Sequence, residues 1–429
     1  MWGQDYPGGR GGALNHWLQC IECGEKYPGD SFIYRCKRCR GLLEVLYDYE
    51  ELAGGLDYEE VKRRSLSVWR YRELLPVEKD AHVVSLGEGG TRLHLCRRLG
   101  ERFGVRNLWV KMEGDNPTCS FKDRGMTVGV SKALEHGVKA VACASTGNTS
   151  ASMAAYAAKA GLKSIVLVPS GKVARGKLAQ AVVHGAEIFQ VEGNFDDALR
   201  LVVDLSEKTR EIYLLNSINP YRIEGQKTLA FEVRDQLGGI PDLMVLPVGN
   251  AGNISALWKG FRELRILGLE DEVPRLVGIQ AEGASPIAEA FKKGLEKIRP
   301  WRRPETIATA IRIGEPVSWM KALKAVRDSR GLMETVSDEE ILEAQRVLAR
   351  SEGLFVEPAS AASIAGLRKL LEEELIQRDM KIVCVATGHG LKDPEAALRN
   401  AEFRRLRGDP MGILSLLEVQ PRYQQPPPT

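Results

Sequence analysis

The sequence predicts an α/β protein with two doubly wound α/β domains that face a cleft, preceded by a small unit rich in cysteine. Three observations predict this fold class. From about residue 106 onward, short apolar runs alternate with segments of helical period, as parallel strands with long crossovers require. The apolar runs are too many for one comfortable sheet, which favours two domains. Near the N-terminus, two Cys-x-x-Cys pairs flank a short strand-rich loop.

The N-terminal unit is predicted to be a zinc ribbon. Four thiolates from two tight turns close a tetrahedron around zinc, which stabilises a segment too small to bury its own core. Four cysteines leave no open position for catalysis, so the predicted role is structural. A ribbon that folds without metal and a pair of disulfides are the alternatives, although four further cysteines scattered along the chain favour a reducing compartment. The predicted ligands are Cys20, Cys23, Cys36 and Cys39.

The α/β units follow in chain order, each an apolar run, then Gly, Ser or Asn, then a helical segment. A helix is expected from Lys122 to Glu135 after NLWVKME, and another over NTSASMAAYAAKAG after AVACAS. Further strands are expected at SIVLVPS, IFQV, IYLLNS, LMVLPVG, RLVGIQA and KIVCVATG, with helices at GKVARGKLAQAVVHG, after IFQV, and at SALWKGFRELR.

This order divides the chain into four parts. Residues 1–48 are assigned to the ribbon-like unit and residues 111–211 to a small α/β domain. Residues 49–110 and 212–400 together form the large α/β domain. The tail, residues 401–429, is polar and proline-rich and is expected to fray.

Composition excludes several classes of function. The 429 residues carry a formal net charge of only +3, which gives no electrostatic footprint of a nucleic-acid binder. No apolar run approaches the roughly 20 residues that a membrane helix needs, and no basic-then-apolar leader is found. We therefore expect a cytoplasmic protein with no nucleic-acid partner and no membrane.

Four segments lie where ligands bind in open α/β sheets, just beyond the carboxyl ends of strands. The first, NPTCSFKDRG, puts Lys122 at the opening of a helix. The positive end of the helix dipole and desolvation both favour the neutral amine, which makes Lys122 a candidate nucleophile. Taken alone, a lysine in this setting is more often a surface residue.

The second and third segments are candidate anion sites. STGNTSAS, residues 145–152, offers clustered hydroxyls, Asn148 and backbone amides to a carboxylate at a helix N-terminus. VGNAGNIS, residues 248–255, contains Gly249 and Gly252, which permit close backbone approach, and successive amides that suit a phosphate. A hydroxyl-rich helix cap and a plain strand-to-helix turn are the alternatives.

The fourth segment, CVATGHGLKD at residues 384–393, supplies a neutral hydroxyl in Thr387 and places His389 between two glycines. His389 alone equally fits a packed turn residue. Together, an amine for an aldehyde, an amide nest for a phosphate, a second anion pocket and a neutral hydroxyl indicate a pyridoxal phosphate site.

Five motifs carry a resemblance to a known family. NPTCSFKDRG, STGNTSAS, LLNSINPYRIEGQKT, LPVGNAGN and ATGHGLKD resemble the motif set of the threonine synthases, in the fold-type II, tryptophan-synthase-β-like group of pyridoxal phosphate enzymes. The resemblance covers nearly the whole chain, from residue 20 to residue 400. The lysine and the glycine loop mark only the wider group, whereas SINPYRIEGQKT and TGHGLKD single out the family.

The resemblance implies a role toward the cofactor for each motif. Lys122 would carry the internal aldimine, Asn148 would hydrogen-bond the cofactor's 3′ oxygen, and Thr387 would face the pyridine nitrogen. The residues implied to cradle the cofactor phosphate are Gly249, Asn250, Ala251, Gly252 and Asn253.

The resemblance also implies how a substrate is held. Its carboxylate would lie in the loop that contains Ser145, Thr146, Asn148, Thr149 and Ser150. Its phosphate would meet Asn216, Ser217 and Arg222, with Asn250 close by. Arginine suits a phosphate because its donors form a fixed fork. Seen without the family, Arg222 equally fits a helix-surface arginine.

The implied reaction is the conversion of O-phospho-L-homoserine and water to L-threonine and phosphate, a β,γ-elimination and replacement in threonine biosynthesis. The family also suggests a homodimer. The chain departs from the family at Cys119, where relatives often carry Gly or another small residue, and at Arg92, which replaces the usual proline.

Two other interpretations stay open. An enzyme of the same fold that acts on O-phosphoserine in sulfur transfer, or a serine/threonine dehydratase, would share the cofactor residues. A dehydratase needs no phosphate pocket, so Arg222 discriminates between them. A non-catalytic protein that binds partners through its zinc ribbon is the alternative of another class, and Lys122 together with the glycine loop argues against it.

Overall fold

The computed structural model describes residues 15–170, 175–192 and 195–399. Its contacts divide the chain after Pro394, and the last described helix is α14 (Pro394–Leu398). The predicted tail, residues 401–429, lies outside the described residues.

The N-terminal ribbon is a three-stranded antiparallel sheet. It consists of β1 (His16–Cys20), β2 (Lys26–Pro28) and β3 (Leu43–Tyr47), in the order β2-β1-β3. In β1 and β3 every second side chain is buried, because successive residues of a strand point to opposite faces. The buried face, which includes Leu18 and Val45, belongs to the same apolar cluster as much of the chain that follows.

The larger sheet has six strands: β4 (Leu93–Leu95), β5 (Leu108–Met112), β10 (Leu243–Pro247), β11 (Arg275–Ala281), β12 (Leu332–Val336) and β13 (Ile382–Ala386). Their order is β12-β11-β10-β13-β5-β4, and all pairs are parallel except that of the edge strand β4. In β10, Leu243 and Val245 pack into one apolar cluster, whereas Met244 and Leu246 pack into the other. The sheet is therefore buried on both faces, as parallel sheets are.

Helices cover this sheet. They are α3 (Arg97–Phe103), α8 (Tyr221–Leu237), α9 (Gly252–Ile266), α10 (Pro286–Lys292), α11 (Trp319–Asp328), α12 (Asp338–Glu352) and α13 (Pro358–Glu372), preceded in the chain by α1 (Tyr49–Gly55) and α2 (Tyr58–Arg63). α13 contacts the four strands from β10 to β13 and packs on α12, which contacts α3. α9 and α11 contact β11, and α8 packs on α9.

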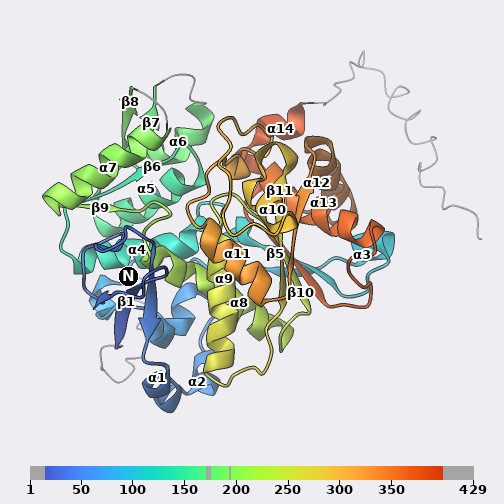
Figure 1. Ribbon diagram of the computed structural model, residues 1–429, viewed down its shortest axis with the longest axis horizontal. Helices are drawn as coiled ribbons and strands as arrows, with labels where there is room; N and C mark the ends of the chain where they lie inside the picture. Colours follow the sequence, from blue (N-terminus) through green and yellow to red (C-terminus); the bar gives the residue numbers. More distant parts are fainter. Residues whose placement is uncertain (1–14, 171–174, 193–194, 400–429) are drawn as a thin grey trace, which may run out of the picture. The chain divides into compact units, whose positions relative to one another are not determined.

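The smaller sheet has four parallel strands: β6 (Ala140–Ala144), β7 (Lys163–Pro169), β8 (Glu187–Val191) and β9 (Ile212–Leu214), in the order β8-β7-β6-β9. Its helices are α4 (Lys122–Glu135), α5 (Asn148–Ala160), α6 (Arg175–Val183) and α7 (Phe195–Thr209). α5 and α7 both contact β6 and β7, and these elements gather around the sheet in Figure 1.

The predicted helix from Lys122 to Glu135 is confirmed at both ends, and each predicted strand is present. β4 and β12 were not predicted.

The predicted boundary between residues 110 and 111 falls inside β5, a strand of the larger sheet. The boundary between residues 211 and 212 stands just before β9, which pairs with β6 in the smaller sheet. The division into domains stays a prediction.

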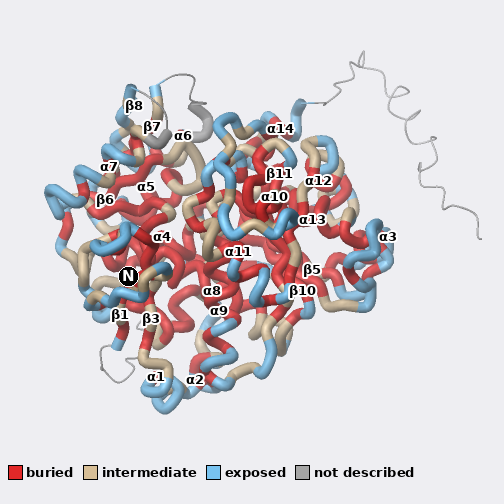
Figure 2. The backbone as a smooth tube through the Cα atoms, viewed as in Figure 1, coloured by how far each residue is buried: buried red, intermediate tan, exposed pale blue. Residues whose placement is uncertain are grey.

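α8 runs through the middle of this arrangement. Every residue from Tyr221 to Val233 is buried, and the backbone along α8 and α9 is largely red in Figure 2. A buried ion cluster joins these two helices: Lys227 Nζ lies 2.7 Å from oxygens of both Glu224 and Glu263, and Lys259 Nζ lies 2.8 Å from Glu224. The ribbon closes over the cluster, because Tyr47 Oη donates to Glu224 at 2.6 Å.

Candidate active site

Lys122 is the first residue of α4, directly after the loop that follows β5. Its Nζ lies 4.1 Å from the centroid of the Phe121 ring. Burial, and then the positive charge of Arg222, lower the pKa of Lys122 to about 7, while the charge of Glu357 opposes them. A large share of the amine is therefore neutral near pH 7, as a nucleophile for an aldehyde must be.

The loop before Lys122 is held on two sides. Asp123 accepts hydrogen bonds from Thr118 N at 2.7 Å and from the hydroxyl of Ser152 on α5. Phe121 N donates to Thr387 O at 3.0 Å, which ties the loop to the segment after β13. Cys119 has a φ of 65°, in the left-handed region that favours glycine. A glycine at this position would adopt the same conformation without strain.

Glycines let α4 and α8 touch, and this brings Lys122 and Arg222 together. A Cβ on Gly225 would lie 1.7 Å from Arg124 O, and a Cβ on Gly125 would lie 2.8 Å from Arg222 O. No larger residue fits at either position without moving a backbone. The start of α8 is thereby fixed against the start of α4.

Arg222 is buried and has no partner among the described residues. Its residue is 3% exposed, and no described residue pairs with its guanidinium; Nε is buried and lacks a hydrogen bond. Burial lowers the pKa of Arg222 to about 10. An uncompensated buried guanidinium costs several kcal/mol, so the site is built for an anion that supplies the missing charge.

The glycine loop after β10 forms a cradle at the start of α9. Ala251 has a φ of 64°, and α9 begins at Gly252. A Cβ on Gly249 would approach Ala310 O to 3.1 Å. Both polar atoms of the Asn253 amide are buried and lack partners. Free backbone amides at a helix N-terminus together with an unpaired amide suit a phosphate.

The loop from residue 145 to 150 surrounds the first turn of α5. Ser145 Oγ accepts from Gly147 N at 3.2 Å, and Ser150 Oγ donates to Gly147 O at 2.9 Å. Asn148 Nδ2 donates to both carboxylate oxygens of Glu357, at 3.3 and 3.2 Å. Thr146 and Thr149 lie in the same half-buried loop.

The other predicted residues differ in whether their side chains already make hydrogen bonds within the protein. Thr387 lies 5% exposed at the end of β13, with its Oγ1 3.1 Å from Ser360 Oγ. Asn216 is already engaged, because its amide pairs with both the N–H and the carbonyl of Ala144 at 2.9 Å. Asn250 Oδ1 accepts from Val317 N at 3.2 Å. Ser217 is half-buried in the turn after β9.

Glu357 was not predicted to belong to the site. It precedes α13, and the bridge between Val356 and His389 brings it to the segment after β13. Glu357 lies directly before Pro358, and a proline at the first position of a helix is common, so the sequence signals only a helix start.

The four ribbon cysteines have the geometry of a metal site. The Sγ atoms of Cys20 and Cys39 are 3.4 Å apart, those of Cys23 and Cys36 3.5 Å, and those of Cys39 and Cys23 3.4 Å. All four lie within 4.8 Å of one another. Tetrahedral zinc with bonds of about 2.3 Å separates its sulfurs by about 3.8 Å, so a zinc ion fits with a small expansion.

Removing the metal is expected to lower the melting temperature of the protein by at least about 5 °C, because the ribbon is too small to keep its shape alone and covers the buried ion cluster. Thermal unfolding with and without a strong chelator, together with the zinc content per chain, measures this. Cys39→Ser should reproduce the loss and no longer respond to chelator, whereas Cys96→Ser, which leaves the four ribbon cysteines intact, should respond to chelator as the wild type does. An unchanged melting temperature in zinc-free protein would contradict the structural role.

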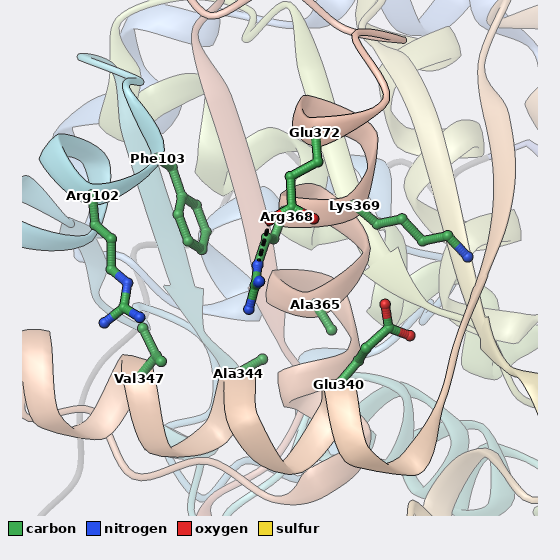
Figure 3. A pocket seen from close by; sticks show the side chains of 9 residues that line it. All are labelled: Arg102, Phe103, Glu340, Ala344, Val347, Ala365, Arg368, Lys369 and Glu372. Carbon is green, nitrogen blue, oxygen red and sulfur yellow. Dashed lines mark hydrogen bonds and ion pairs between the residues drawn. The ribbon is translucent and has the colours of Figure 1, made fainter. Parts of the chain in front are cut away.

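A separate cavity of about 70 Å³ lies between α3, α12 and α13, and none of the candidate residues lines it (Figure 3). Among its charged side chains, Arg368 pairs with Glu372 at 2.7 Å, and Lys369 Nζ lies 3.3 Å from Glu334. It is therefore a cavity between helices and not part of the candidate site.

Within the described part of the chain, no helix is long and apolar enough to cross a membrane.

This chain is similar in sequence to proteins of known function. Residues 84–388 match the family model described as pyridoxal-phosphate dependent enzyme. The threonine synthase of Methanocaldococcus jannaschii is 60% identical over 385 residues, which cover 90% of this chain and 95% of that protein. The threonine synthase of Mycobacterium tuberculosis H37Rv is 55% identical over 330 residues, covering 77% and 89% respectively.

Solved structures agree on the fold. The processed form of threonine deaminase isoform 2 from Solanum lycopersicum superposes with a TM-score of 0.62 at 21% identity, covering 83% of this chain and 95% of that one. At this identity the likeness concerns the fold alone, which confirms the predicted fold type II. The chain therefore belongs to the pyridoxal-phosphate dependent enzymes and, within them, to the threonine synthase family.

Proposed function

We propose that this chain is a threonine synthase, which converts O-phospho-L-homoserine and water to L-threonine and phosphate with pyridoxal phosphate as cofactor. The family membership supports the reaction. The observation that carries the proposal is the buried, unpartnered Arg222, because a dehydratase acting on serine or threonine would have no anion to place against it.

The residues present fit the cofactor. The neutral amine of Lys122 suits its aldehyde, and the cradle from Gly249 to Asn253, with its unpaired amide, suits its phosphate. Thr387 offers a neutral hydroxyl to its ring nitrogen. When bound, the cofactor supplies the electron sink that stabilises negative charge on carbon.

The side chains of this protein orient the substrate and move protons. Ser145, Thr149 and Ser150 hold the substrate carboxylate with the amides at the start of α5. Arg222 holds the phosphate, with Ser217 and Asn250 close by. Asn216 stabilises the loop after β6 through its two hydrogen bonds with the backbone of Ala144. Lys122 takes the proton from the α carbon and returns protons in later steps, which its lowered pKa favours near neutral pH.

The setting of the reaction is also proposed. We expect the enzyme to work as a homodimer in the cytoplasm, with a small domain around β6–β9 and a large domain around the six-stranded sheet. Its partner is the small-molecule substrate, and nucleic acid and membrane play no part.

The apoprotein is expected to capture pyridoxal phosphate faster as the pH rises, with a midpoint near 7 that reflects the neutral form of Lys122. An ordinary lysine would give a midpoint near 10.4. Rapid-mixing absorbance at a series of pH values measures the rate. Arg222→Met should raise the midpoint, because the positive charge of Arg222 disfavours a protonated Lys122. A wild-type midpoint above about pH 9 would contradict the environment described for Lys122.

The test of the function is the release of phosphate from O-phospho-L-homoserine by the purified, cofactor-loaded protein, with threonine quantified in the same tube. Equal amounts of phosphate and threonine are expected. Loss of phosphate from O-phosphoserine, or keto-acid formation from threonine, without turnover of O-phospho-L-homoserine would replace this proposal with one of the alternative activities.

A further inference from the structure

Glu357 is a buried carboxylate that touches the candidate site and has no role in the reaction described above. Its residue is 4% exposed. Asn148 Nδ2 lies 3.3 and 3.2 Å from its two oxygens, and no other described side chain donates a hydrogen bond to it. Buried carboxylates are normally well supplied with donors. Glu357 is buried with one side-chain donor, the amide of Asn148, which suggests that its role is to hold that amide in place.

The position of this carboxylate is built into the fold. Glu357 N donates to Gly388 O at 3.1 Å. A Cβ on Gly388 would lie 2.6 Å from Glu357 Oε1, so the glycine that follows Thr387 leaves the space that the carboxylate fills. The backbone bond and the missing side chain together aim Glu357 at the first residue of α5.

The charges around Glu357 act in both directions. Burial raises its pKa, as does the charge of Asp393, whereas the hydrogen bond from Asn148 and the positive charges of Lys392 and Lys122 lower it. Positive charge therefore reaches Glu357 from α4 and from the segment after β13. The net effect is a raised pKa of Glu357, and both of its oxygens accept from Asn148 Nδ2, as those of an ionised carboxylate do.

An ionised carboxylate can orient a neighbouring amide. The side chain of asparagine can turn over and exchange its oxygen for its NH₂ group. Facing Glu357, only the NH₂ orientation makes a hydrogen bond, and the amide then has a second N–H left to donate elsewhere.

We propose that Glu357 is a positioning residue, which fixes the amide of Asn148 so that its second N–H faces the 3′ oxygen of the cofactor. This inference rests on the proposed function, specifically on the contact between Asn148 and the cofactor.

The two ways in which Glu357 can influence the cofactor have opposite signs. A donor to the 3′ oxygen stabilises the deprotonated, anionic form of the bound cofactor, so losing that donor raises the pH midpoint of its visible absorption band. A negative charge that acts directly stabilises the protonated form, so losing the charge alone lowers the midpoint.

The experiment compares the cofactor-loaded wild type with Asn148→Ala, Glu357→Leu, which removes the acceptor of the Asn148 amide, and the double variant. The midpoint of the visible band and the dissociation constant of pyridoxal phosphate are measured for each. In both single variants the midpoint is expected to rise and the dissociation constant to increase about tenfold. The double variant should be no worse than either single one, because both substitutions remove the same donor. A lowered or unchanged midpoint in Glu357→Leu, or a roughly hundredfold additive loss of affinity in the double variant, would overturn the proposal.

Two further variants separate positioning from folding. Gly388→Ala keeps the carboxylate but displaces it from Asn148, so it should raise the midpoint as Glu357→Leu does. Glu334→Gln removes another buried carboxylate, on the edge strand β12, and should leave the band unchanged. No assay in this set uses O-phospho-L-homoserine, so a wrong substrate assignment would not affect the result. If Asn148→Ala leaves both band and affinity unchanged, the cofactor contact of Asn148 fails, and this inference fails with it.

Discussion

Lys122→Ala is expected to lower threonine formation by about 10³-fold or more, because the variant loses both the amine that holds the cofactor covalently and the base that moves the α proton. Steady-state assays of phosphate and threonine measure the loss. Borohydride reduction followed by mass spectrometry should add the mass of the cofactor to the wild type and not to the variant.

The fold should survive this substitution. The Nζ of Lys122 contacts the Phe121 ring and makes no hydrogen bond with a described residue, so the melting temperature should change little. Lys139→Ala is a matched control, since Lys139 is exposed and, among the described residues, pairs only with Glu211. A Lys122→Ala variant that keeps a tenth of the activity would assign the proton transfer to another group.

The second large effect is expected at Arg222. Arg222→Met should lower kcat/KM for O-phospho-L-homoserine by about a hundredfold or more, because the substrate phosphate loses its buried partner. The same change should stabilise the substrate-free protein by about 1 kcal/mol or more, because it replaces an uncompensated buried charge with an apolar side chain of similar size. Kinetics and thermal unfolding of one preparation measure both effects.

Inorganic phosphate gives an independent check on Arg222. In the cofactor-loaded wild type, where the glycine cradle is already filled, added phosphate should raise the melting temperature by mass action. Arg222→Met should lose this response, and Arg262→Met, at an exposed position of α9, should keep it. A phosphate response that persists in Arg222→Met would place the anion site elsewhere.

Local sequence patterns were sufficient for the strands that precede the site and for the helices that follow them. The helix from Lys122 to Glu135 has the predicted ends, since an apolar strand, a turn and a periodic segment are all short-range signals. β12 was missed because LMETV carries only a weak apolar run in a region where no loop motif drew attention to it.

The missing parts of the site depend on contacts between distant segments. Glu357 belongs to none of the motifs that the sequence analysis identified. It contacts Asn148, which lies 209 positions away in the chain. The sequence identified Arg222 only through the family, because its significance lies in the lack of a partner after burial, which no local pattern encodes. The engagement of Asn216 with Ala144 likewise follows from the pairing of β6 with β9.

The ribbon is synthesised well before α8, the helix on which it docks. Tyr47 and its acceptor Glu224 are 177 positions apart. At 5–20 residues per second, the ribbon leaves the ribosome roughly 10 to 35 s before the helix on which it docks. During that interval its four thiols have no core to shelter them, so early metal capture would protect them from oxidation. The docking of an already metallated ribbon would then be one of the last steps that complete the helix carrying Arg222.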